Sequence, residues 1–183
     1  MKTVRVLDKD FTLFIESDKI QETITSLAEK MNNDLKDKNP LFLVVLNGAF
    51  MFAADLFKNL TIPCEITFVK LSSYIGTQTT SVVRELIGLD EVLTDRTVVI
   101  VEDIIDTGIT MGVTTEKLRK LNAKDVRIAT LLFKPDAFRM NYEINYIGLS
   151  IPNDFIVGYG LDYDGFGRNL PHIYKILDKD GES

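Results

Sequence analysis

Along the chain, continuous runs of apolar residues alternate with segments whose apolar residues recur at helical spacing. Short continuous apolar runs, typical of strands buried on both faces, occur at 41–46, 64–71, 98–101, 126–133, 145–150 and 154–159. Apolar residues at helical spacing occur at 20–35, at 50–60 and in a third helix lined by Met111, Thr114, Leu118 and Leu121. Alternating strands and helices predict an α/β fold, a mostly parallel sheet with helices on both faces.

Polar segments lie between these elements. Ser17 or Asp18 is the expected N-cap of the first helix. The segment SSYIGTQTTS at 72–81 is rich in serine, threonine and glycine, and we expect a loop there, followed by a short strand at 82–87.

Further polar residues follow the predicted strands directly. These are Asn47 and Gly48, Ser72 to Tyr74, Glu102 and Asp103, and Lys134. Because ligands bind at the carboxyl ends of parallel strands, we expect these groups to converge on one rim of the sheet.

Composition and charge narrow the class of protein. The 183 residues correspond to one domain, and a net charge of -6 argues against broad nucleic-acid binding. The N-terminus MKTVRVLDKD has no apolar signal-peptide core and the run 41–46 is too short to span a membrane, so a cytoplasmic protein is expected. The single cysteine excludes an intramolecular disulfide, and the single histidine, His172, cannot form a multi-histidine metal site.

The stretch VVIVEDIIDTGITM at 98–111 holds the candidate chemistry. A buried strand leads into Glu102, Asp103 and Asp106, and the following TGIT can turn with Gly108 at positive φ. Backbone N–H groups at the start of the next helix, with the hydroxyls of Thr107 and Thr110, would then form a phosphate nest. Carboxylates beside such a nest suit a sugar phosphate, because they accept hydrogen bonds from its hydroxyls.

Other interpretations of this stretch fit its sequence less well. A solvated acidic loop is the usual meaning of an acidic run, but the position directly after a buried strand argues against it. The lysine-containing P-loop pattern and the G-x-G-x-x-G dinucleotide pattern are absent, as is the D-x-D pattern of aspartyl-phosphate hydrolases.

The stretch resembles the phosphoribosyl diphosphate (PRPP) binding motif of the type I phosphoribosyltransferases, in the form carried by the hypoxanthine-guanine enzymes. The resemblance runs from about residue 41 to 174. It implies a five-stranded parallel core at about 36–160 and a small hood from about 1–16 and 161–183, within one domain. It also implies that Glu102 and Asp103 hold the ribose and metal, and that Asp106 exchanges a proton with the purine N7.

Two further segments resemble parts of the family's PRPP site. LNGAFMFAADL is similar to the pyrophosphate-binding turn, which implies that Asn47 and Gly48 bind pyrophosphate and that the Leu46–Asn47 peptide is cis. LSSY is similar to the start of the family's mobile lid, with Ser73 and Tyr74 as its signature.

The remaining two segments resemble the family's purine site. LLFK implies that Lys134 contacts the purine 6-oxo group. DFIVGYGLDYDGFGRNLP implies that Phe155 stacks on the base, Ile156 offers backbone hydrogen bonds, Asp162 binds magnesium and Arg168 meets pyrophosphate. Each of these residues taken singly has an ordinary structural explanation, and their joint order and spacing carries the resemblance.

The chain departs from the family at three positions. Asn47 and Ile109 stand where the family often has lysine, and Ala49 stands where it often has a second glycine. Loss of these cations would shift the binding of pyrophosphate toward Mg²⁺, Lys70 and Arg168.

The resemblance implies a purine-salvage enzyme that transfers phosphoribose from PRPP to N9 of a 6-oxopurine, releasing the nucleoside monophosphate and pyrophosphate. Hypoxanthine is the favoured base and Mg²⁺ the cofactor, with a homodimer or homotetramer as the assembly and no nucleic-acid or membrane partner. Guanine or xanthine preference stays open. A non-catalytic PRPP-sensing regulator is the alternative from another class, and a sugar-phosphate hydrolase ranks third.

Overall fold

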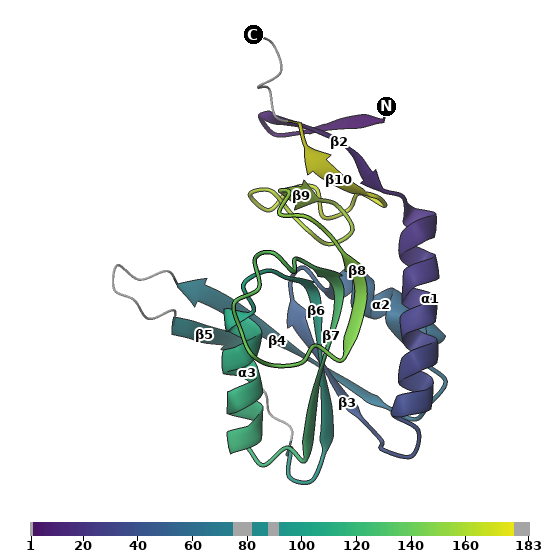
Figure 1. The fold of residues 1–183 in the computed structure, drawn as a ribbon, viewed down its shortest axis with the longest axis vertical. Helices are drawn as coiled ribbons and strands as arrows, with labels where there is room; N and C mark the ends of the chain where they lie inside the picture. Colours follow the sequence, from purple (N-terminus) through teal and green to yellow (C-terminus); the bar gives the residue numbers. More distant parts are fainter. Residues whose placement is uncertain (1, 75–81, 88–91, 178–183) are drawn as a thin grey trace.

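The computed structural model describes residues 2–74, 82–87 and 92–177, with the backbone alone at 72–74 and 82–87. The expected alternation of strands and helices is confirmed (Figure 1). The elements in chain order are β1 (Thr3–Val6), β2 (Lys9–Ile15), α1 (Ser17–Asp34), β3 (Leu41–Leu46), α2 (Phe50–Asn59), β4 (Glu65–Tyr74), β5 (Val82–Ile87), β6 (Thr97–Ile105), α3 (Ile109–Lys120), β7 (Asp125–Phe133), β8 (Tyr146–Ser150), β9 (Ile156–Val157) and β10 (Ile173–Ile176).

The larger sheet has the strand order β5-β4-β3-β6-β7-β8. Its strands β4, β3, β6, β7 and β8 run parallel, which confirms the five-stranded parallel core, and β5 adds to β4 in the antiparallel direction. From β3 the chain winds outward to β4 on one side, and from β6 to β7 and β8 on the other. The winding direction therefore switches between β3 and β6, where a ligand crevice is expected at the carboxyl ends.

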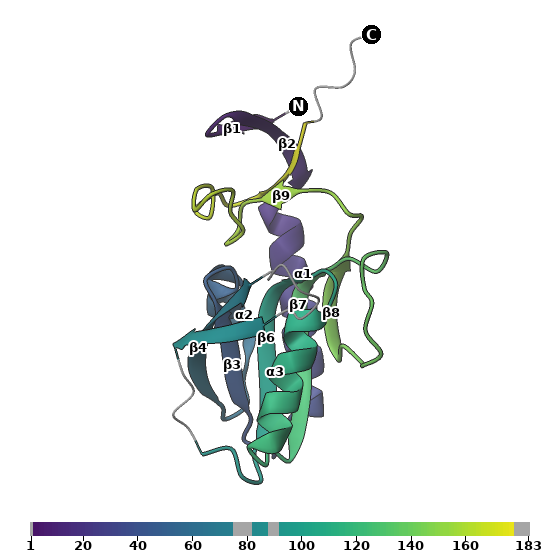
Figure 2. The same cartoon turned by 90° about the vertical axis from the view of Figure 1, so that its left-hand side faces the viewer.

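Helices cover both faces of this sheet, α1 and α2 on one face and α3 on the other (Figure 2). Side chains alternate along each strand, so Val99 and Val101 pack into the core beneath α1 and α2. Val98 and Ile100 pack into the core beneath α3. Both faces of β6 are therefore buried, which explains its unbroken apolar run.

Helix α1 differs at its N-terminus from the prediction. Its N-cap is Glu16, which makes no side-chain capping bond, and not Ser17 or Asp18. The Ser17 N–H donates instead to Nδ1 of His172, at 2.9 Å. A histidine distant in sequence thus satisfies one of the free donors at this helix end.

Three elements extend differently from the prediction. Strand β4 continues through Tyr74, so Ser72 to Tyr74 are in a strand and not in a loop, while 75–81 lie outside the described residues. Strand β6 continues to Ile105, so Glu102 and Asp103 belong to the strand. Leu121 follows the last turn of α3 and is 44% exposed, so it does not line the buried face.

A second, antiparallel sheet with the order β1-β2-β10-β9 joins the two ends of the chain above the larger sheet (Figure 1). It has its own small core, which includes Phe11, Val157 and Tyr174. Strand β9 lies in the range expected for the parallel core but pairs here with β10. Within the described part of the chain, no helix has the length and apolar character needed to cross a membrane.

We expect Leu56→Ala, in α2, to lower the free energy of unfolding by about 2–5 kcal/mol, because the side chain is fully buried in the core between α2 and the sheet. Leu121→Ala is the control and should change it by less than about 0.5 kcal/mol, because that side chain is largely solvated. Urea denaturation measures both. Equal losses in the two variants would contradict this description of the core.

Candidate active site

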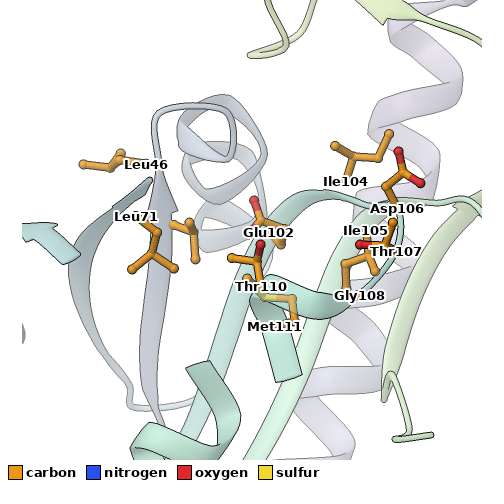
Figure 3. A pocket seen from close by; sticks show the side chains of 11 residues that line it. Leu46, Leu71, Glu102, Ile104, Ile105, Asp106, Thr107, Gly108, Thr110 and Met111 are labelled. Atoms are coloured by element: carbon orange, nitrogen blue, oxygen red, sulfur yellow. The ribbon is translucent and has the colours of Figure 1, made fainter. Parts of the chain in front are cut away.

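A cavity of about 270 Å³ opens at the carboxyl ends of the central strands (Figure 3). Residues from the ends of β3, β4 and β6 and from the start of α3 line it: Val45, Leu46, Leu71, Glu102, Ile104, Ile105, Asp106, Thr107, Gly108, Thr110 and Met111. Five of the predicted site residues are among them. The cavity lies at the switch between β3 and β6, where ligands bind in such sheets, and of the polar residues expected at the strand ends Glu102 lines it.

The two acids at the end of β6 have different surroundings. Glu102 lines the cavity, whereas the Asp103 carboxylate lies directly against Gly48 in the turn after β3. A Cβ atom on Gly48 would overlap that carboxylate, so no other residue fits there without a shift. One Asp103 oxygen also accepts the Ile104 N–H at 2.8 Å. Asp103 therefore joins β6 to the turn at 47–48.

The Glu102 carboxyl has an unusual proton affinity. Burial raises its pKa well above the usual value, and the neighbouring charge of Asp103 raises it further. The Asp103 N–H donates to Glu102 Oε1 at 3.3 Å, which opposes this shift in part. A cation or hydroxyl donors bound in the cavity would offset the cost of the charged form.

The loop between β6 and α3 has the conformation that the sequence predicted. Gly108 has φ of 82° and is the N-cap of α3. A Cβ atom there would also overlap the ring of Phe138, so both the backbone conformation and the packing require glycine. The start of α3 lies at the cavity, where Thr107 and Thr110 add hydroxyls (Figure 3). The Ile109 N–H donates to the Thr107 hydroxyl at 3.5 Å.

Tyr142 packs on the same loop from behind. Its hydroxyl donates to the Gly108 carbonyl at 2.6 Å. Burial, and then the charge of Glu102, raise the pKa of Tyr142 to about 12, so this hydroxyl stays protonated at neutral pH. Sequence analysis missed Tyr142, because nothing in its local pattern links it to a loop more than thirty residues earlier.

Asp106 and Lys134 meet at the outer side of the cavity. Lys134 Nζ lies 3.7 Å from Asp106 Oδ2, and the lysine side chain is 11% exposed while that of Asp106 is 55% exposed. The Lys134 N–H also donates to the Ile105 carbonyl at 2.9 Å, which fixes the end of β7 beside the end of β6. A cation and an exposed carboxylate are thus held side by side at the strand ends.

The turn after β3 contains the cis peptide Leu46–Asn47 that the resemblance implied. Gly160 approaches Gly48 so closely that a Cβ atom on Gly160 would overlap the Gly48 carbonyl. Arg168 Nη1 donates to the Gly160 carbonyl at 2.7 Å. The turn at 47–48 and the segment that carries Arg168 are therefore in direct contact through Gly160.

Asp162 and Arg168 pair with each other on that segment. Arg168 Nη2 lies 2.6 Å from Asp162 Oδ1, and Asp162 Oδ2 accepts the Gly165 N–H at 2.6 Å. Within the described residues, no three histidine, cysteine or acidic side chains group as a metal site. The acids present at the site, Glu102, Asp103 and Asp162, offer hard carboxylate oxygens, which Mg²⁺ prefers.

Phe155 and Ile156 lie where β9 begins. The Phe155 ring is 44% exposed, and its centroid lies 5.9 Å from that of Tyr163. The Ile176 N–H donates to the Phe155 carbonyl, and Ile156 faces Lys175. This register makes Ile156 and Lys175 a non-hydrogen-bonded pair, which directs the N–H and C=O of Ile156 away from β10.

The predicted site residues therefore fall into groups. Glu102, Asp106, Thr107, Gly108 and Thr110 line the cavity, and Asp103 adjoins it through Gly48. Arg168 and Asp162 reach the same turn through Gly160. Phe155 and Ile156 are not part of the cavity lining: Ile156 belongs to β9 of the antiparallel sheet and Phe155 directly precedes it. The side chains of Ser73 and Tyr74 lie outside the described part of the structure.

Comparison with known proteins agrees with this geometry. The sequence model of the phosphoribosyl transferase domain matches residues 16–164. The hypoxanthine-guanine phosphoribosyltransferase of Mycobacterium tuberculosis is 40% identical over 169 residues, which cover 88% of this chain and 84% of that protein. The enzyme of the same name from Streptococcus pyogenes is 40% identical over 168 residues, which cover 91% of this chain and 93% of that protein.

Solved structures show the same fold. A hypoxanthine phosphoribosyltransferase from Staphylococcus aureus superposes with a TM-score of 0.86 at 33% identity, covering 93% of this chain and 94% of that one. A hypoxanthine-guanine phosphoribosyltransferase from Bacillus anthracis, with HEPES in its active site, superposes with a TM-score of 0.86 at 35% identity, covering 90% of this chain and 98% of that one. With a family match over most of its length and relatives this similar, the chain belongs to the phosphoribosyltransferase family of transferases.

Proposed function

We propose that the protein transfers phosphoribose from PRPP to N9 of a 6-oxopurine, with hypoxanthine as the favoured base, and releases the nucleoside monophosphate and pyrophosphate. The observation that carries this proposal is the cavity at the β3–β6 switch, in which carboxylates and a glycine loop at a helix N-terminus face the same space. Carboxylates suit the ribose hydroxyls and the loop suits the 5′-phosphate. The names of the relatives support the purine as acceptor.

The phosphoribosyl group is held from two sides. Glu102 and Asp103 accept hydrogen bonds from the ribose hydroxyls, and the loop of Thr107, Gly108 and Thr110 binds the 5′-phosphate through hydroxyls and backbone N–H groups. Their fixed positions lower the entropic cost of bringing the sugar carbon to the purine nitrogen. The high pKa of Glu102 in the empty protein supports this role, because donors from a ligand relieve a buried carboxylate.

The leaving pyrophosphate is bound at the turn after β3. Asn47 and Gly48 contribute this turn, and Arg168, held against it through Gly160, supplies the cation. Arginine suits phosphate because its planar donors bind two oxygens together. Since Asn47 replaces the family's usual lysine, Arg168 carries more of the charge, together with Lys70.

The base is oriented by residues on two elements. Lys134 donates to the 6-oxo group, and the adjacent Asp106 exchanges the proton at N7. The exposed ring of Phe155 stacks on the purine, and the backbone groups of Ile156, directed away from β10, bond to its edge. Adenine lacks the 6-oxo acceptor and is therefore disfavoured by Lys134.

The donor set fits Mg²⁺ as the cofactor. The candidate ligands are Glu102, Asp103 and Asp162, of which one or two would hold the ion with oxygens of the substrate, since Mg²⁺ is usually bound by one or two carboxylates plus phosphate groups. In the described residues these acids do not group as one three-carboxylate site. When bound, Mg²⁺ supplies Lewis-acid stabilisation of the departing anion. Asp162 is paired with Arg168, so a cation bound by Asp162 would share that carboxylate with the guanidinium.

Three further assignments stay predictions. They are the single-domain division, the lid role of Ser73 and Tyr74, and the cytoplasmic location. Assembly as a homodimer or homotetramer has support from exposed apolar side chains on the α2 side of the sheet, Phe50 at 43%, Ile66 at 41% and Phe68 at 42%.

The first test offers hypoxanthine, guanine, xanthine and adenine in parallel with PRPP, with and without Mg²⁺. We expect Mg²⁺-dependent nucleotide formation, fastest with hypoxanthine and slowest with adenine. Asp106→Asn should lower kcat by about 10²–10⁴-fold with little change in the KM for PRPP, because it removes proton transfer. Measurable PRPP binding without nucleotide from any base would favour the regulator instead, and equal losses in kcat and PRPP affinity would make Asp106 a loop-supporting residue.

We expect Glu102→Gln to stabilise the empty protein at neutral pH while weakening PRPP binding. Between the usual carboxyl pKa and the raised pKa of native Glu102, the folded protein keeps a proton that the unfolded chain releases. The free energy of unfolding therefore falls as the pH rises through this range. Glutamine mimics the protonated form, and its benefit should disappear below the usual carboxyl range. Urea denaturation across pH measures this, with Glu116→Gln as an exposed control; a pH-independent gain would refute the explanation.

Light scattering should give two or four times the chain mass of 20.7 kDa. Phe68→Lys should shift the mass toward the monomer, because it places a charge in the exposed apolar surface. Val113→Lys on α3, also exposed at 44%, is the control on the opposite face of the sheet. A monomeric parent protein, or dissociation by the control alone, would exclude assembly through the α2 side.

A further inference from the structure

The loop at 107–110, called the phosphate loop below, has carbonyl oxygens that accept hydrogen bonds from residues on the side away from the cavity. The segment 138–142 supplies both donors. The Arg139 N–H donates to the Thr107 carbonyl at 3.1 Å, and the Tyr142 hydroxyl donates to the Gly108 carbonyl at 2.6 Å. Neither donor lines the cavity, so both act on the loop from behind.

Fixing these carbonyls also fixes the N–H groups of the loop. In a planar trans peptide the C=O and the following N–H point in opposite directions. The bond to Thr107 thus directs the Gly108 N–H away from the segment 138–142. The Gly108 carbonyl accepts the Tyr142 hydroxyl and also, at 3.0 Å, the Gly112 N–H of α3. Tyr142 therefore acts together with the first helical bond to direct the Ile109 N–H, which donates to Thr107 Oγ1 at 3.5 Å. The cavity lies on the side away from the segment 138–142, where Thr107 and Gly108 line it.

The position of the Tyr142 hydroxyl is itself fixed by packing. Its ring centroid lies 5.3 Å from that of Phe138 in an edge-to-face contact, and Phe138 makes the same type of contact with Phe133 of β7, also at 5.3 Å. A Cβ atom on Gly108 would lie 2.8 Å from the Tyr142 oxygen, so ring and loop are in direct contact. Edge-to-face contacts that lead from Tyr142 through Phe138 to Phe133 of the sheet therefore fix the position of the Tyr142 hydroxyl.

We propose that Tyr142 is a positioning residue for the 5′-phosphate of the substrate, acting through the Gly108 carbonyl to aim the Ile109 N–H into the cavity. This inference rests on the proposed function. It has particular weight in this chain because the side chain of Ile109 is uncharged, so this position offers a phosphate only its N–H group. Binding there depends on preorganised backbone donors, whose value comes from their fixed direction.

The test is Tyr142→Phe, which removes the hydroxyl and keeps the ring. We expect the KM for PRPP to rise about 3- to 10-fold, the range of one net hydrogen bond, with kcat and the KM for hypoxanthine near their parent values. Calorimetry should show the same factor for inosine monophosphate, which carries a 5′-phosphate, and no change for pyrophosphate. Amide exchange at 108–110 should accelerate relative to the rest of α3.

Tyr146→Phe is the matched control. Tyr146 is fully buried, whereas Tyr142 is half-buried, and its hydroxyl is also hydrogen-bonded, accepting from Arg127 Nη1 at 2.9 Å. It belongs to β8 and packs beneath α1. It should lose comparable thermal stability without any change in nucleotide affinity. A similar loss of affinity for inosine monophosphate in both variants, or an unchanged affinity in Tyr142→Phe, would overturn the positioning role. A parent protein that binds neither PRPP nor inosine monophosphate would instead overturn the proposed function itself.

Discussion

The structure depends on one constraint, that β6 is buried on both faces and still ends in carboxylates at the surface of the sheet. Val98 to Val101 are fully buried between α3 on one side and α1 and α2 on the other, which fixes the strand rigidly. Glu102 and Asp103 continue the same strand, so their positions are set by the core and not by a loop. Burial raises the pKa of Glu102, so its charged form is costly there, and a ligand with hydroxyls or a cation offsets that cost.

Close backbone contacts, more than ion pairs, join the parts of the site. Gly48 leaves space for the Asp103 carboxylate, and Gly160 leaves space for the Gly48 carbonyl. These two approaches link β6, the turn after β3 and the segment that carries Arg168 in one continuous contact. A larger residue at either position would separate the acids from the arginine. The shape of the site therefore requires glycine at both positions, because only glycine lacks a Cβ atom.

Two parts of the site, the segment beginning at Gly158 and the loop before α3, are each supported by a tyrosine that does not line the cavity. The Tyr159 hydroxyl donates to Asp55 Oδ2 on α2 at 2.6 Å, which anchors the segment beginning at Gly158 to the helix after the turn at 47–48. Tyr142 anchors the loop before α3 in the same way. Both tyrosines have raised pKa values because they are buried, so both stay neutral donors at physiological pH. Rigid support of this kind gives the loops their directions before any ligand binds.

The sequence by itself determined the order of strands and helices, the rim on which Glu102, Asp106 and Lys134 meet, and the positive φ of Gly108, because buried periodicity, strand ends and glycine are local signals. The resemblance added the cis peptide and the hood. Only the tertiary structure decided that Glu102 and Asp103 lie within β6, that the His172 side chain accepts the Ser17 N–H at the start of α1, and that Tyr142 bonds to the loop before α3. These contacts join residues far apart in the chain, and their partners are chosen by the packing of whole elements, which no local pattern encodes.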